Sequence, residues 1–168
     1  WSGMATATTL TLVNSGDTVY VRGKLTGNNN NSNYTQFKTT SGKFSVIGNI
    51  NNIWNYEDLE QPLYEYCGYC LFSDCAGLVG TDELVLSATK LASNCYSGMF
   101  YGCSSLSDIK SLENWSVSNG NNFSYMFYGC SSLSNIKSLE KWNVSNGNNF
   151  SYMFKGCSLL TNIKSLEK

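Results

Sequence analysis

The sequence repeats itself at a fixed interval in its C-terminal half. Met99, Met126 and Met153 are equally spaced and mark the starts of successive units. The segments 99–125 and 126–152 are identical at 24 of 27 positions. A period of roughly 20–50 residues is typical of architectures in which structural units stack on one another. The spacing therefore predicts an array of stacked units.

A less similar copy precedes these two units. The stretch CLFSDCAGL, residues 70–78, aligns with MFYGCSSL of the next unit, so that Cys75 corresponds to Cys103. Cys67 precedes Cys95 by the same interval. We therefore place the array at residues 58–168, with units starting near residues 71, 99, 126 and 153. The sequence ends inside the fourth unit, so we expect it to be part of a longer protein.

One unit of this length is too short to bury a stable core of its own, so each unit must pack on its neighbours. Side chains at one repeat position should then form columns through the array. The predicted core columns contain the phenylalanine, cysteine and tryptophan of each unit: Phe100, Phe127, Phe154, Cys103, Cys130, Cys157, Trp115 and Trp142.

Within a unit, two segments have different patterns. Apolar residues at positions 123, 126, 127 and 130 have the i, i+3, i+4, i+7 spacing of a helix face. Asn119 or Asn121 could cap the start of such a helix, and Gly129 could end it. The segment 106–112 is short and rich in branched residues, which favours a strand. We therefore predict an α/β solenoid with one parallel strand and one short helix per unit.

The N-terminal residues 1–57 lack the repeat and predict a small β-rich unit that caps the array. Apolar residues alternate on either side of the turn-forming segment 14–17, as in a hairpin. A second hairpin is predicted around Ser41 and Gly42, with Phe37 and Phe44 on its two strands. The segment 27–33, GNNNNSN, should be a loop between the hairpins.

The charge balance excludes several classes of partner. The formal net charge is −1, so nothing favours binding to nucleic acid or to an anionic membrane surface. No apolar run approaches the ~20 residues of a membrane helix, and we expect no membrane insertion. Tyrosine and glycine are abundant, with 11 and 15 copies, and there is one proline.

Seven cysteines would suggest disulfides in a secreted chain. However, four of them share one repeat position, which favours small buried core residues. The pairing Cys67–Cys95 stays open, because stacked neighbours could bring the two residues together. Cys67 and Cys70 form a lone CxxC without a second pair or any histidine, so we predict no metal site.

The repeat words resemble those of the BspA-like leucine-rich-repeat surface proteins, in particular their mycoplasma-lipoprotein type. The words are MFYGCSSLSNIKSLEKWNVSN, residues 126–146, and SATKLASNCYSGMFYGCSSL, residues 87–106. The likeness covers residues 67–168. It implies a leucine-rich-repeat-like solenoid on a bacterial cell surface or in a secreted protein, acting in adhesion to an extracellular protein or glycan.

Two sets of residues are candidates for ligand contact. Lys110, Lys137 and Lys164 form a basic ladder. The alternative is a solvated face on which each lysine pairs with a neighbouring glutamate. Tyr125, Tyr128 and Tyr152 lie outside the apolar stripe, and exposed tyrosines give contact area at low entropic cost. Packing between units is the alternative for the tyrosines.

Two further functions are alternatives to recognition. Near-identical repeats also suit a structural stalk or spacer that displays another domain. An enzyme is not expected, because histidine is absent and no nucleophile elbow or phosphate-binding glycine loop occurs. No cofactor is predicted. The fourth unit lacks a covering neighbour in this sequence, which predicts end-to-end association of the array.

Overall fold

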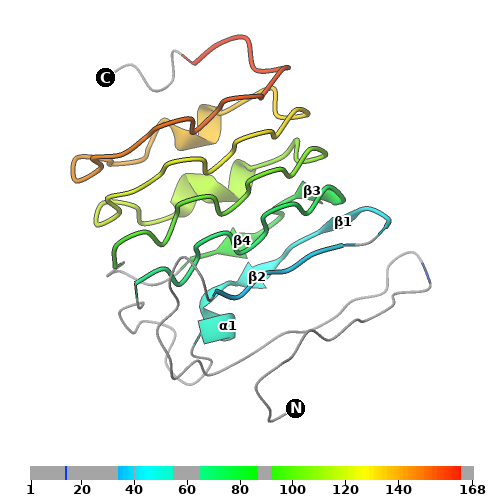
Figure 1. Cartoon of the computed structure of the whole chain (residues 1–168), viewed down its shortest axis with the longest axis horizontal. Helices are drawn as coiled ribbons and strands as arrows, with labels where there is room; N and C mark the ends of the chain where they lie inside the picture. The colour runs from blue at the N-terminus through cyan, green and yellow to red at the C-terminus, as the bar shows by residue number, and fades with distance from the viewer. Residues whose placement is uncertain (1–13, 15–33, 40, 55–64, 87–91, 164–168) are drawn as a thin grey trace.

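The computed structural model describes residues 14, 34–39, 41–54, 65–86 and 92–163 (Figure 1). The predicted hairpin around residues 14–17, the loop 27–33 and Lys164 lie outside the described residues, apart from Asn14. Among the described residues, no helix has the length and apolar character needed to cross a membrane.

Regular secondary structure is short throughout the described residues. The elements in chain order are β1 (Phe44–Ser45), β2 (Gly48–Asn49), α1 (Asn51–Trp54), β3 (Leu78–Gly80), β4 (Leu84–Val85) and the 3-10 helices η1 (Lys110–Asn114) and η2 (Lys137–Leu139). β1 pairs in parallel with β3, and β2 pairs in parallel with β4. Isolated parallel bridges join Gly80 to Asp108 and Asn122 to Asn149.

Successive units form coils that lie side by side, as Figure 1 shows along the green, yellow and orange parts of the chain. Backbone N–H groups of one coil donate to carbonyls of the next. In the second unit these donors are Gly98, Phe100 and Gly102, which donate to Ser124, Met126 and Tyr128 at 2.9, 2.9 and 2.7 Å. Each coil therefore supplies the hydrogen-bond acceptors of the coil before it.

The prediction of a helix at residues 123–130 is wrong. In this segment successive backbone N–H groups alternate between acceptors in the next coil and acceptors in their own coil. Tyr125 donates to Ser151 of the next coil, while Met126 donates to Phe123 in its own coil. Tyr125 and Gly129 have positive φ values of 57° and 73°, as the third residue of a type II turn requires. The segment is thus a staircase of tight turns with a left-handed residue every fourth position.

The strand expected at residues 106–112 is also wrong as a whole. Only Asp108 in this segment makes a β-bridge, and η1 begins at Lys110. Leu106, Ile109 and Leu112 are nevertheless all buried. Ile109 is the N-cap of η1 and Leu112 lies within it, and their spacing of three residues matches the period of a 3-10 helix. Burial was correctly indicated by the apolar pattern, but the backbone conformation was not.

The expected hairpin around Ser41 and Gly42 does not form. Phe37 and Phe44 instead both donate to the following coil, to Leu71 and Gly77, at 2.7 and 3.0 Å. The described residues between 34 and 50 thus belong to one more coil, which runs parallel to the first recognised unit. These bonds cross the predicted boundary at residue 57, and the division into two domains stays a prediction.

The core is built from columns of identical or similar side chains. One column contains Phe37, Phe72, Phe100, Phe127 and Phe154, whose neighbouring rings stack at 5.8, 5.6, 5.5 and 5.6 Å. Except for Phe37 and Phe154, which are half-buried, these rings are at most 2% exposed. Ring stacking and the backbone hydrogen bonds between neighbouring parallel coils together hold each coil on the next.

A column of four cysteines runs beside the phenylalanines. Each thiol donates to the backbone carbonyl of the phenylalanine one coil earlier, as Cys103 does to Phe72 at 3.0 Å and Cys130 to Phe100 at 3.2 Å. The two tryptophans make a similar link, since the indole nitrogens of Trp115 and Trp142 donate to carbonyls of the preceding coil. The repeat cysteines thus have a bonding role in addition to filling the core.

Candidate functional site

The turn staircase places tyrosines on one surface of the array. Inward positions are taken by Phe123, Met126 and Phe127, which are fully buried. Tyr125 and Tyr128 occupy the positions between and after them, and Tyr125 is 39% exposed. The same turns in the next coil leave Tyr152 53% exposed. The surface therefore repeats with the coil.

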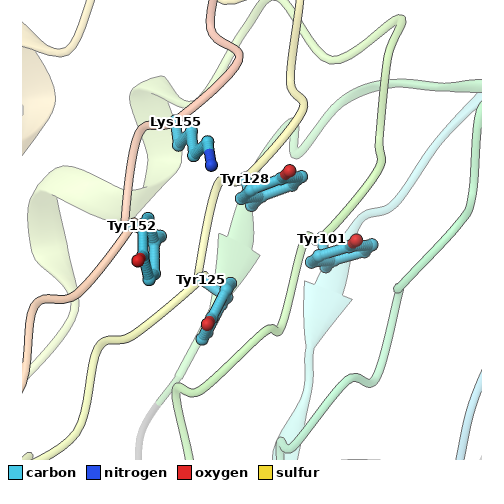
Figure 2. Close-up of a pocket in the computed structure, with 5 residues that line it drawn as sticks. All are labelled: Tyr101, Tyr125, Tyr128, Tyr152 and Lys155. Atoms are coloured by element: carbon cyan, nitrogen blue, oxygen red, sulfur yellow. The ribbon is translucent and has the colours of Figure 1, made fainter.

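Four tyrosines and one lysine line a depression of about 290 Å³: Tyr101, Tyr125, Tyr128, Tyr152 and Lys155 (Figure 2). The Tyr101 and Tyr128 rings stack face to face at 4.8 Å with an angle of 5°. Tyr125 and Tyr152 form a second pair at 5.3 Å, tilted by 32°. Tyr125 also lies 5.9 Å from Tyr128, so the two pairs form one cluster.

Lys155 is the cation of this cluster. Its Nζ lies 4.9 Å from the Tyr152 ring centre and 6.0 Å from that of Tyr128, within the range of cation–π attraction. Lys155 occupies the repeat position of Tyr101 and Tyr128, so it replaces a third stacked tyrosine. Our sequence reasoning missed it, although this departure from the repeat was a visible signal.

A second depression of about 340 Å³ adjoins the first. It shares Tyr101 and Tyr125 with the first depression and is also lined by Tyr34 and Tyr69, which meet edge to face at 5.1 Å. Sequence reasoning missed these two tyrosines, because neither belongs to the regular repeat. We call the six tyrosines and Lys155 the tyrosine surface: Tyr34, Tyr69, Tyr101, Tyr125, Tyr128, Tyr152 and Lys155.

Charge on the tyrosine surface is sparse. Asp74 lines the second depression, and its carboxylate lies 3.9 Å from the ammonium of Lys38. Burial raises the pKa of Tyr69, and the neighbouring Cys70 adds to the shift. Phenol hydroxyl groups, aromatic edges, the Lys155 ammonium group and the Asp74 carboxylate are thus what the two depressions offer to a ligand.

Two tyrosines of this surface have an unfavourable backbone conformation. Tyr125 and Tyr152 have φ values of 57° and 58°, a region that is uncommon for bulky residues. The equivalent residue in the second unit is Gly98, at φ 61°, which adopts this region without steric cost. The two tyrosines therefore stand where the backbone would favour glycine.

Lys110 and Lys137 of the lysine ladder lie apart from the tyrosine surface. Lys110 and Lys137 are exposed at the starts of η1 and η2, and neither lines the two depressions. Glu113 pairs with Lys141 of the next coil rather than with a ladder lysine. The hydrogen bond from Lys141 lowers the pKa of Glu113 and correspondingly raises the pKa of Lys141.

Burial keeps the thiols of the cysteine column protonated. Burial raises the pKa of the Cys75 and Cys157 thiols to about 11 and raises the pKa of Cys103 and Cys130 further still. Since metals bind the thiolate form, these protonated thiols are poor ligands. Within the described part of the chain, no group of three or more residues is arranged to hold a metal ion.

Comparison with known protein families gives a match over the repeat region. No curated protein and no solved structure matches the chain. The matched segment starts just before the second unit and leaves out residues 67–87, where the repeat is less regular. Residues 88–167 match a protein family described as "Mycoplasma protein of unknown function, DUF285".

Proposed function

We propose that this chain is a recognition module of a bacterial cell-surface or secreted protein and that it binds an extracellular protein or glycan through the tyrosine surface. The family match over residues 88–167 supports a bacterial origin. The repeat words support the narrower relationship to BspA-like leucine-rich-repeat proteins. The coils are proposed to form a leucine-rich-repeat-like solenoid in which tight turns replace the regular strand and helix.

The observation that carries this proposal is the gathering of four tyrosines and Lys155 around one surface depression. A left-handed conformation costs a non-glycine residue about 1–2 kcal/mol, and Gly98 satisfies the same turn without that cost. Tyr66, Cys70, Asp74 and Asn94 have the same left-handed conformation, so it belongs to the turns in general and adds a cost at Tyr125 and Tyr152. Tyrosine is also among the residue types that are enriched at binding hot spots.

Ring stacking and the position of Lys155 determine which groups the proposed surface presents to a ligand. Tyr101 and Tyr128 cover each other's faces, so their edges and hydroxyl groups are what a ligand would meet. A partner with hydrogen-bond acceptors and some apolar surface fits this arrangement. The rings lose little side-chain freedom on binding, because stacking already limits it.

The direct test is an array of glycans and extracellular-matrix proteins probed with the labelled chain. The variants Tyr152→Gly and Tyr128→Ala should weaken binding to any positive ligand at least tenfold. The matched control Lys110→Ala alters the other candidate surface and should leave binding unchanged. Loss of binding in Lys110→Ala with full binding in both tyrosine variants would assign recognition to the lysine ladder instead.

A structural spacer is the second candidate function. It is favoured by the near-identity of the units 99–125 and 126–152, in which 24 of 27 positions are the same, because duplicated coils add length without shaping a unique surface. A silent array would support the spacer. So would a chain whose hydrodynamic length increases by a constant amount with each added unit.

A further inference from the structure

One repeat position differs between the first two coils and the later ones. The residue four positions before the start of each unit is Cys67, Cys95, Asn122 and Asn149 in turn. In the later coils the asparagine Oδ1 accepts a hydrogen bond from the backbone of Ser124 or Ser151, at 2.9 and 3.0 Å. A cysteine cannot make this side-chain turn, so the first two coils give up a local stabilising bond.

The two cysteines that replace asparagine lie against each other. Their Sγ atoms are 2.8 Å apart, and each residue is 3% exposed. Backbone bonds on both sides keep the coils in register, from Tyr66 to Ser93 at 3.0 Å and from Cys70 to Ser97 at 3.1 Å. The sulfur atoms therefore meet in a position fixed by the backbone.

Gly68 allows this close approach. A Cβ atom at this position would lie 2.3 Å from the carbonyl oxygen of Cys95, so any side chain would push the two coils apart. Glycine is thus the residue type at position 68 that lets the cysteine pair form.

The remaining cysteines have other surroundings. Cys75, Cys103, Cys130 and Cys157 each donate to a backbone carbonyl. Cys70 is half-buried and lines the second depression of the tyrosine surface. Cys67 and Cys95 are the pair whose thiols face each other.

We propose that Cys67 and Cys95 form a disulfide that links the first two coils when the protein folds under oxidising conditions. The oxidant is a small-molecule disulfide such as oxidised glutathione. The Cys95 thiolate attacks one sulfur of the oxidant and displaces one small thiolate, leaving a mixed disulfide. The Cys67 thiolate then attacks Sγ of Cys95 and displaces the second thiolate. Two protein thiols are oxidised and one small disulfide is reduced to two thiols.

The roles of the two residues follow from their contact. The hydrogen bond from Cys67 lowers the pKa of Cys95, which favours Cys95 as the first nucleophile. Because both residues are buried in the folded chain, the oxidant reaches Cys95 when the surface over the two thiols opens locally while the thiol contact is kept. In the folded protein the disulfide is shielded from reductants. This inference does not rest on the proposed recognition function.

The link can be read directly by mass spectrometry. The chain is refolded in a buffer of reduced and oxidised glutathione, its remaining thiols are alkylated, and it is digested with trypsin. Cleavage after lysine separates residues 44–90, which contain Cys67, from residues 91–110, which contain Cys95. We expect these two fragments to be joined without reductant and separate with it.

Variants assign the link to specific residues. Cys67→Ser and Cys95→Asn should both abolish it, and the asparagine variant installs the residue that the later coils use, so it should fold. Cys70→Ser is the control and should retain the link. The urea midpoint of the parent chain should be higher after oxidative refolding than in the presence of reductant. This difference should disappear in Cys95→Asn but remain in Cys70→Ser.

Two results would overturn the inference. One is a fully alkylated set of seven thiols after oxidative refolding of a chain with native circular dichroism. The other is a link that survives in Cys67→Ser but is lost in Cys70→Ser. That result would place the disulfide on Cys70, the second cysteine of the CxxC segment, instead.

Discussion

At the scale of single residues, the array depends on side chains that bond or stack to the coil before them. Phe127 is fully buried between Phe100 and Phe154, with ring angles of 6° and 2° to its neighbours. Cys130 occupies the same coil and donates to the carbonyl of Phe100. Each of these contacts joins two coils, and because Phe127 stacks on both sides, its substitution weakens two interfaces.

Phe127→Ala should be the most damaging of the simple core substitutions. Removing a buried phenylalanine costs about 3–5 kcal/mol of unfolding free energy, and two ring stacks are lost with it. Phe127→Leu keeps most of the volume and should cost less than half as much. Urea unfolding followed by tyrosine and tryptophan fluorescence measures both. Equal costs for the two variants would show that ring stacking, rather than volume, dominates.

The buried thiols predict a loss of stability at alkaline pH. The pKa of Cys75 and Cys157 is raised to about 11 in the folded chain, whereas a thiol in an unfolded chain has a pKa of about 8.5. Below about pH 8.5 both states keep the proton and stability is fully present. As the pH rises towards about 11, the unfolded state releases protons first and stability falls.

Urea midpoints at pH 7 and at pH 10, in the presence of reductant, measure this fall. Cys157→Ser should show a shallower fall than the parent, because its hydroxyl does not titrate there. Tyr96 has a buried hydroxyl whose pKa is also raised, so it contributes to both curves alike. Parallel curves for parent and variant would contradict the role assigned to the thiol.

At the scale of elements, the turn staircase decides what the array presents outside. It places left-handed residues at Gly98 and Gly102 in one coil and at Tyr125 and Gly129 in the next. The conformation is the same, but the outward side chain changes. A sequence can therefore vary the surface at these turns without altering the backbone path.

Tyr152→Gly should be tolerated better than Tyr152→Ala. Glycine removes about 1–2 kcal/mol of left-handed strain, which offsets the lost contact with Tyr125, worth about 0.5–1.5 kcal/mol beyond its buried area. Alanine keeps the strain and loses the contact. We expect the glycine variant to unfold near the parent's urea midpoint and the alanine variant below it. A glycine variant less stable than the alanine variant would mean that the turn does not favour glycine.

At the scale of the whole molecule, stability is shared between neighbouring coils. The hydrogen bonds and ring stacks described above run from each coil to the next, as in other stacked-repeat proteins. Coils in the middle of the array are covered on both sides. In the last described coil, Phe150, Leu159 and Ile163 are 41%, 57% and 52% exposed.

Deletion of residues 126–152 should leave a folded chain. It removes one whole period and joins Tyr125 to Met153, so every remaining residue keeps its repeat position. We expect native circular dichroism and a lower urea midpoint, because one interface is missing. The control deletes residues 126–138, about half a period, which breaks the register and should prevent cooperative unfolding. Cooperative unfolding in both chains would rule out coil register as the basis of the fold.

Exposed apolar side chains on the last described coil predict association of this chain with itself. Phe150 and Ile163 offer apolar surface beside backbone groups that the other coils use for pairing. Sedimentation velocity should show reversible, concentration-dependent dimers. Ile163→Lys should reduce them while leaving intact the stack of Phe150 on Phe123 in the preceding coil. A monomer at all concentrations, with slow amide exchange across residues 150–163, would contradict this.

The sequence by itself determined the period, the residues of the core columns and the stacking of units. These follow from repeated apolar positions, because a single coil is too short to bury Phe100 or Phe127 without a neighbour. The tertiary structure alone decided the conformation within each coil. Apolar residues at 123, 126, 127 and 130 suit a helix and a turn staircase equally well, and the choice depends on whether N–H groups find acceptors in their own coil or in the next. The same stacking decided that Tyr34 and Tyr69 meet the repeat tyrosines, since the distance between residues outside the repeat is not encoded in local spacing. It also decided that Cys67 meets Cys95, a pairing that the repeat interval had left open.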